Sequence, residues 1–294
     1  MEKRTDLAVE ARELAGEDIQ GVEYSEKNEN GMNISRLKVK NHHASLMLKK
    51  EKGTYITIDV PAMTDNFLSS DDRIKTISEE IKRLLPVNGL VLVCGLGNIE
   101  ITPDALGPKT VSRILATRHI KGEIARSTGL DKLRPVAVLS PGVTGQTGIE
   151  TFEYIDSIIK KVRPTALVVI DALASRRLSR LGCTLQISDT GISPGAGVQN
   201  HRRKITTESV GVPVIAIGVP TVVDAVTLVS DMLDVDDEKT SSELRDMLSP
   251  DNRKMVVTPK EIDLLIDRAS RLVSLALNVA LHNDVDVNLI EALL

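Results

Sequence analysis

The stretch LVLVCGLGNIEITPDALGP, residues 90–108, determines the fold class of this chain. A short apolar run is followed by a glycine-rich turn and then by residues that enter a helix. A run of this length and composition is typical of a strand that is buried on both faces of a sheet. Three more such runs, each followed by a polar loop, occur at 136–139, 167–170 and 214–217. This alternation with amphipathic segments predicts an α/β fold with a mostly parallel sheet and helices on its faces.

The residues ahead of this core show a different pattern. Residues 1–32 are polar and charged, and a composition that offers so little apolar surface to bury predicts a mobile arm. Three later segments alternate apolar and polar side chains, which is the period of a strand with one buried face. They are residues 34–39, 44–48 and 55–60. We therefore expect a small antiparallel meander before the α/β core.

The composition excludes several classes of protein. The 294 residues include 37 Lys and Arg against 41 Asp and Glu, a formal net charge of −4, which argues against direct binding of nucleic acid. The chain contains no apolar run of 18 residues and no apolar stretch after its first charges, so we expect neither a membrane span nor a secretory signal. Cys94 and Cys183 lie far apart and match no zinc spacing, which favours a cytoplasmic protein without disulfides or a cysteine-bound metal.

Two carboxylates follow strands of the predicted sheet. Asp104 lies in the loop after the first apolar run, and Asp171 directly follows the third run, where we expect the strand to end. Ligands of open parallel sheets bind beyond the carboxyl ends of the strands, so both side chains are expected in one crevice. Two aspartates held close together share a proton, and one can then activate water while the other protonates the substrate. The alternative is that each aspartate caps a helix.

Other motifs in these loops give weaker evidence for a functional site. The sequence GLG at 95–97 follows a strand, but Glu100 stands where a dinucleotide-binding loop has its third glycine, so no nucleotide cofactor is expected. The five histidines show no spacing typical of metal ligands. Arg202 and Arg203 belong to a basic cluster on a long loop, which indicates either an anionic substrate pocket or a solvated surface.

Five motifs resemble those of a known family. They are TPDALGP at 102–108, LSPGVTGQTGIET at 139–151, IDALASR at 170–176, QISDTGISPGAGVQN at 186–200 and GVPTVVDA at 218–225. Together they resemble the germination protease, or spore protease, of spore-forming bacteria, and the similarity extends from RTDLAVEA at 4–11 to MVVTPKEID at 255–263. Two differences from the family are visible, because the segment before RTDLA is short and residues 232–254 lack a long insertion.

The resemblance implies a fold, an activity and partners. The family fold is similar to that of the hydrogenase maturation proteases, a three-layer α/β/α sandwich. The implied protein is a homotetrameric endoprotease of the spore core, which degrades small acid-soluble spore proteins during germination and uses no cofactor. Catalysis in the family is assigned to an atypical aspartate pair, whose positions by motif are Asp104 in TPDALGP and Asp171 in IDALASR.

The resemblance also implies a zymogen that removes its own N-terminal segment. The family's substrate site has the form acidic, apolar, Ala, variable, Glu, and residues 6–10 are DLAVE, so we expect cleavage between Asp6 and Leu7. A cation should bind the acidic residue before the cleaved bond, and the candidates are Arg176, Arg177, Arg202 and Arg203. The expected organisation is a pro-segment at 1–6, an arm and β-rich portion at 7–65 and an α/β catalytic core at 66–294, in one compact domain.

Two other classes of function stay open at this point. A metal-dependent maturation endopeptidase of the same fold would use Asp104 and Asp171 as metal ligands, although no histidine follows a strand end to complete such a site. A non-catalytic α/β protein would bind a ligand in the same crevice without cleaving peptides. Metal analysis and a peptidase assay separate these alternatives.

Overall fold

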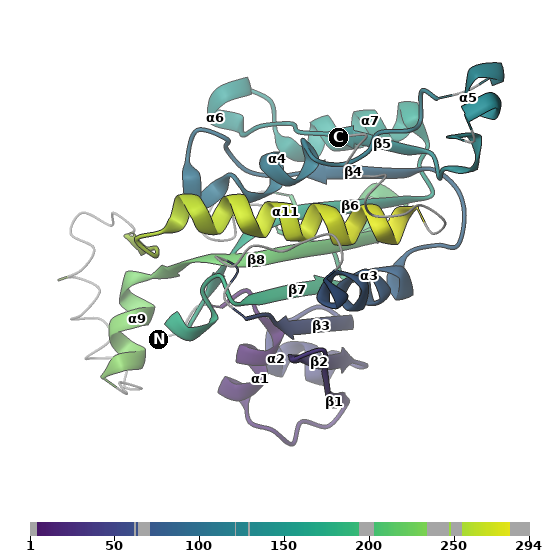
Figure 1. Ribbon diagram of the computed structural model, residues 1–294. Coiled ribbons are helices and arrows are strands. Elements are labelled where there is room, and N and C mark those ends of the chain that lie inside the picture. Colours follow the sequence, from purple (N-terminus) through teal and green to yellow (C-terminus); the bar gives the residue numbers. More distant parts are fainter. Residues whose placement is uncertain are drawn as a thin grey trace.

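The computed structural model describes residues 5–61, 63, 71–120, 122–128, 130–193, 203–233, 247 and 255–282 (Figure 1). Its strands are β1 (Val22–Glu29), β2 (Met32–Val39), β3 (Gly53–Asp59), β4 (Val91–Gly95), β5 (Val136–Leu139), β6 (Ala166–Ser175), β7 (Thr184–Ser188), β8 (Val214–Asp224) and β9 (Val256–Val257). The longer helices are α1 (Ala8–Ala15), α2 (His42–Leu48), α3 (Asp72–Leu84), α5 (Gly122–Thr128), α7 (Thr151–Val162), α9 (Ala225–Met232) and α11 (Ile262–Leu281). The shorter ones are η1 (Thr102–Asp104), α4 (Leu106–Val111), η2 (Leu130–Lys132), α6 (Thr144–Thr147), η3 (Leu178–Arg180) and α8 (Thr207–Val210).

The strands of the described residues form one mixed sheet. Its nine strands have the order β1-β2-β3-β7-β8-β6-β4-β5, and β9 pairs with β8. Pairing is parallel between β5, β4, β6 and β8, and antiparallel from β8 through β7, β3 and β2 to β1. The α/β prediction is confirmed, but the sheet is mixed and not mostly parallel, because parallel pairing is confined to the four strands that the apolar runs identified. The N-terminal strands continue this sheet, because β3 pairs with β7.

Alternate side chains of each strand point to opposite faces of the sheet. Helices pack against the side chains on both faces. On one face, Val91 and Val93 of β4 belong to a core that includes α3, α4 and α11. On the other face, Leu92 of β4 packs against α7, and Leu37 of β2 packs against α1 and α2. The layers are therefore α/β/α, with two separate helical groups on the second face. None of the helices in the described ranges has the length and apolar character needed to cross a membrane.

Two predictions for the N-terminal residues are wrong. Residues 44–48, expected as a strand, lie in α2, because the side chain of Asn41 accepts a hydrogen bond from the N–H of Ala44 and caps a helix. The described part of residues 1–32 contains α1 and β1 rather than a mobile arm. β1 pairs with β2 along its whole length, and the backbone hydrogen bonds of an edge strand need little apolar surface.

The strand that carries Asp171 is longer than its apolar run. β6 continues beyond Asp171 because its pairing with β8 extends to the pair Ser175↔Val223, with one irregularity after Leu173. Asp171 therefore lies within the strand and not directly after it, which corrects the sequence prediction. Its neighbour Ile170 points into the first-face core, so the pleat directs Asp171 to the second face.

Candidate active site

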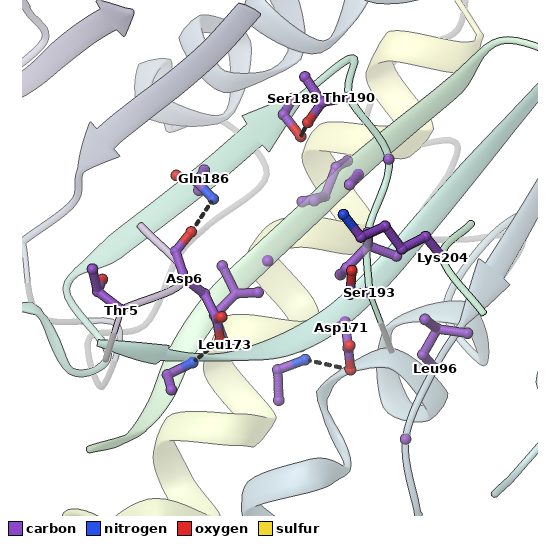
Figure 2. A pocket seen from close by; sticks show the side chains of 18 of the residues that line it. Thr5, Asp6, Leu96, Asp171, Leu173, Gln186, Ser188, Thr190, Ser193 and Lys204 are labelled. Atoms are coloured by element: carbon purple, nitrogen blue, oxygen red, sulfur yellow. Dashed lines mark hydrogen bonds between the residues drawn. The ribbon is translucent and has the colours of Figure 1, made fainter. Parts of the chain in front are cut away.

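A cavity of about 1030 Å³ lies on the second face of the sheet, between the two helical groups. Its floor is formed by β6, β7 and β8, which contribute Asp171, Gln186 and Gly218 respectively. One wall comes from α2 and the residues that follow it, and another from η1 and the loop between β4 and η1. Figure 2 shows this pocket with Asp6, Asp171 and Gln186 among its lining residues.

Asp171 lies on the cavity floor and is 7% exposed. Its Oδ1 accepts a hydrogen bond from the N–H of Ala172 at 2.9 Å. Gly218 pairs with Asp171 on one side and with Gln186 on the other. Asp171 and Gln186 therefore lie two strands apart, about 10 Å between their backbones, with no side chain from position 218 between them. Both side chains can thus reach a peptide that lies across β8.

Asp104 reaches the cavity from η1. The preceding loop turns at Gly97, whose φ is +111°, and an added Cβ there would lie 2.0 Å from the carbonyl oxygen of Asp104. Only glycine permits this approach. The Oδ2 of Asp104 accepts a hydrogen bond from the N–H of Asn98 at 2.7 Å. The hydroxyl of Thr221 on β8 donates to the carbonyl of Pro103 at 2.8 Å, which ties η1 to the sheet.

Both candidate aspartates line the same cavity. Asp171 comes from β6, and Asp104 follows β4, the parallel neighbour of β6. Because the carboxyl ends of parallel neighbours lie at the same edge of a sheet, the order of strands brings both residues to the same cavity. The cavity can accommodate a peptide beside them. The catalytic role of the pair stays a prediction.

Thr5 and Asp6 line one side of this cavity (Figure 2), and residues 7–11 continue from them past β6 into α1. The N–H of Asp6 donates to the carbonyl of Ala174 at 2.9 Å, and the N–H of Ala174 donates to the Asp6 carboxylate at 2.8 Å. Leu7 is fully buried and packs against Leu173. The expected cleavage site is thus held on β6. The acidic side chain of Asp6 is bound by the backbone N–H of Ala174, whereas we expected an arginine to bind it.

Glu10 is fully buried beside the end of β6. Its carboxylate accepts hydrogen bonds from the backbone N–H groups of Arg176 at 2.8 Å and Arg177 at 3.0 Å. The Arg180 guanidinium lies 3.7 Å from the same carboxylate. Arg176 and Arg177 therefore contact the glutamate four positions after the expected bond. Their guanidinium groups pair with Glu13, at 3.2 Å and 3.0 Å.

The other two predicted arginines are placed differently. The guanidinium of Arg203 lies over the ring of Phe152 on α7, 4.0 Å from its centre, and Arg203 is exposed and does not line the cavity. Arg202 lies outside the described residues. Lys204, the next residue of the basic cluster, lines the cavity and pairs with Glu51 at 2.6 Å.

Two residues that sequence analysis did not select contact the expected cleavage site. The carbonyl oxygen of Asp6 accepts hydrogen bonds from Nζ of Lys50 at 2.8 Å and from Nε2 of Gln186 at 3.0 Å. Gln186 carried a sequence signal, because it is a long polar side chain within the buried strand TLQIS. Lys50 carried none, since it is one of three lysines in the polar stretch KKEK.

The thiol of Cys94 lies near Asp171 but does not line the cavity. Burial raises the pKa of the Cys94 thiol, and the charge of Asp171 raises it further, so this cysteine stays protonated and is not a candidate nucleophile. Across the described ranges, no three His, Cys, Asp or Glu side chains are grouped so that they could hold a metal ion.

Comparisons with known proteins identify the family. Residues 2–236 match the family described as germination protease, peptidase family A25. Germination proteases from Caldanaerobacter subterraneus subsp. tengcongensis, Clostridium perfringens (strain 13) and Priestia megaterium are 46%, 40% and 36% identical to this chain. The alignments cover 95%, 95% and 96% of this chain and 94%, 95% and 94% of those proteins.

Solved structures include one distant match. The NiFe hydrogenase maturation protease HycI from Thermococcus kodakarensis aligns with a TM-score of 0.37 and 15% identity, over 67% of this chain and 98% of that one. The family assignment depends on the sequence matches, which extend over most of the chain at 36% to 46% identity. This chain therefore belongs to the germination protease family and is a peptidase.

Proposed function

We propose that this chain is an endopeptidase that degrades small acid-soluble spore proteins during germination, with Asp104 and Asp171 as its general acid and base. Family membership supports the substrate class. The observation that supports the site is the binding of residues 6–10 along β6, with Asp6 in the cavity that both aspartates line. These residues are DLAVE, which has the form of the expected substrate site.

In the proposed reaction, a peptide bond is hydrolysed between the two carboxyl groups. The ionised carboxylate takes a proton from water, and the water oxygen attacks the carbonyl carbon. The protonated partner gives its proton to the leaving amide nitrogen as the C–N bond breaks. Two carboxylates that share one site disfavour double ionisation, which keeps one of them protonated.

The docked residues indicate how a substrate is recognised. The acidic side chain before the bond is bound by the N–H of Ala174, and the apolar side chain after it packs against Leu173. The glutamate four positions after the bond accepts hydrogen bonds from the N–H groups of Arg176 and Arg177. Arg176 and Arg177 are therefore proposed to bind substrate through their backbone N–H groups. The proposed roles of Arg202 and Arg203 rest on the family resemblance alone.

The same contacts support self-processing. An uncut chain places its own DLAVE sequence where a substrate would bind, so the chain is expected to block its cavity until the bond between Asp6 and Leu7 is cleaved. Residues 1–6 are then the pro-segment, followed by the portions 7–65 and 66–294. A homotetramer in the spore core stays a prediction from the family.

The test compares wild-type protein with Asp104→Asn and Asp171→Asn. Each is incubated alone and with a small acid-soluble protein, and intact masses are followed over time. Loss of a general acid or base should lower both cleavage rates by about 10² to 10⁴. Asp156→Asn is the control, because Asp156 lies on α7 and pairs with Lys160 at 2.6 Å, and its rates should match the wild type. Near-normal turnover at position 104 or 171 would exclude that residue, and a wild type that cuts neither substrate would refute the proposed function.

A further inference from the structure

The carbonyl oxygen of Asp6 is held by two side chains. Lys50 donates to it from the end of α2 at 2.8 Å. Gln186 donates to it from β7 at 3.0 Å, and Figure 2 shows this second hydrogen bond. This oxygen belongs to the peptide bond between Asp6 and Leu7, the proposed cleavage site. In a docked strand, a backbone carbonyl usually pairs with a backbone N–H of its neighbour. Here two side-chain donors meet at the oxygen instead.

Gln186 contacts the backbone on both sides of Leu7. Its Nε2 donates to the carbonyl of Asp6, and its Oε1 accepts from the N–H of Ala8 at 2.7 Å. The two hydrogen bonds require opposite ends of the side-chain amide, so they define which end faces the Asp6 oxygen. Gln186 is 8% exposed, and little water competes for its N–H.

Lys50 brings a positive charge to the same oxygen. Lys49 ends α2 in the left-handed conformation, with φ of 51°, and the next residue turns into the cavity. Nζ of Lys50 also lies 3.3 Å from the carbonyl oxygen of Thr5. Burial lowers the pKa of Lys50, while the charges of Asp6 and Glu10 oppose this shift. A cation with little hydration stabilises negative charge on a neighbouring oxygen more strongly than one in water.

We propose that Lys50 and Gln186 are catalytic residues that bind the oxyanion formed when water attacks the carbonyl before the cleaved bond. This inference rests on the proposed function. Attack forms a bond between the water oxygen and the carbonyl carbon, and the π-electron pair moves onto the Asp6 oxygen between the two donors. The pair returns as the C–N bond breaks, and the Leu7 nitrogen takes its proton from the acidic carboxyl group. The products are a carboxylate at Asp6 and a free amine at Leu7.

A purely structural role for these donors makes a different prediction. If Lys50 and Gln186 only anchor the chain, their removal loosens residues 5–11 and weakens substrate binding, without slowing a bound substrate. If they stabilise the oxyanion, removal slows the chemical step, because only interactions stronger in the transition state raise kcat. The separate effects on kcat and KM therefore distinguish the two roles.

The experiment uses full-length Lys50→Met, Gln186→Met and Lys50→Arg. Self-cleavage between Asp6 and Leu7 is timed by intact mass, and kcat and KM are measured on a small acid-soluble protein. Each Met variant should lose about 10² to 10³ in self-cleavage rate and in kcat, with KM changed less than about fivefold. Lys50→Arg keeps a cationic donor, so its self-cleavage rate and kcat should be at least about tenfold higher than those of Lys50→Met. Lys75→Met is the control, because Lys75 lies on α3 outside the cavity and pairs with Asp72 at 3.2 Å.

Several outcomes would overturn the inference. Wild-type kcat in both Met variants would do so, and so would a rise in KM alone. Thermal unfolding identifies a Met variant that does not fold. In that case, kcat and KM of the other Met variant and of Lys50→Arg decide between the two roles. If the wild type cuts the added protein but not itself, the kcat values of the variants on the added protein decide. A wild type that cuts neither substrate refutes the proposed function and is thereby distinguished from failure of the two donors.

Discussion

Replacing Glu10 with glutamine is expected to loosen residues 5–11 from β6 and from the cavity that Thr5 and Asp6 line. The Glu10 carboxylate is fully buried and accepts hydrogen bonds from the N–H groups of Arg176 and Arg177 and from the hydroxyl of Thr5. A buried carboxylate that accepts several donors contributes more than a neutral group, at about 1.5–3 kcal/mol for each charge-assisted bond. The interaction at Glu10 is therefore large enough to measure.

The expected size of the effect follows from the geometry. Glutamine keeps one oxygen acceptor and replaces the other with an NH₂ group, which faces donors and cannot accept from them. At least one charge-assisted bond is lost and another becomes neutral, so docking should weaken by about 2–4 kcal/mol. Because about 1.36 kcal/mol corresponds to a factor of ten, the docking equilibrium should fall by about 30- to 900-fold.

The assay is hydrogen exchange in the Asp171→Asn background, where the bond between Asp6 and Leu7 is expected to stay intact. The amides of residues 7–11 should exchange about 30- to 900-fold faster in Glu10→Gln, up to the limit set by global unfolding. Glu17→Gln, at an exposed position just after α1, is the control and should leave their exchange unchanged. A change of less than about threefold in Glu10→Gln would show that the Glu10 carboxylate does not hold this segment.

Two further predictions concern the floor of the cavity and the last helix. A Cβ added by Gly218→Ala would lie 2.5 Å from Cγ of Leu173, and this overpacking should lower the free energy of unfolding by about 1–3 kcal/mol; an unchanged unfolding free energy in urea titrations would contradict this. Burial lowers the pKa of His282 below 6.5, so the unfolded chain binds a proton that the folded chain does not. Its contribution to the unfolding free energy should therefore fall by up to about 1.4 kcal/mol per pH unit from 6.5 down to the folded-state pKa. His282→Gln should flatten this dependence in urea titrations between pH 5 and 7.5, and an unchanged slope would refute the assignment.

Local sequence patterns by themselves determined the parallel part of the fold. The apolar runs at 90–94, 136–139, 167–170 and 214–217 correspond to β4, β5, β6 and β8. The pattern was sufficient because a strand covered on both faces needs apolar side chains in both directions, whatever packs on it. Amphipathic segments were likewise expected between the apolar runs, and α7, which spans Thr151–Val162 between β5 and β6, is one of them.

Other elements depended on contacts that local patterns do not contain. Residues 44–48 alternate as a strand does, yet the cap from Asn41 makes them a helix. The polar composition of β1 predicted an arm, but pairing with β2 makes it a strand. The end of β6 was misplaced for the same reason, since β8 continues to pair with it beyond Asp171. In each case the competing interaction involves backbone hydrogen bonds, which side-chain periodicity does not reveal.

For the candidate site too, some features followed from local sequence and others only from tertiary contacts. The sequence by itself determined that Asp104 and Asp171 follow the first and third apolar runs, and therefore that both belong near one edge of a parallel sheet. Only the tertiary structure decided that Lys50 and Gln186 meet at the Asp6 carbonyl and that Glu10 lies against Arg176. The physical reason is that these hydrogen bonds join groups 44 to 180 positions apart in the chain, so they form only when β7 is inserted between β3 and β8 and α1 packs beside them.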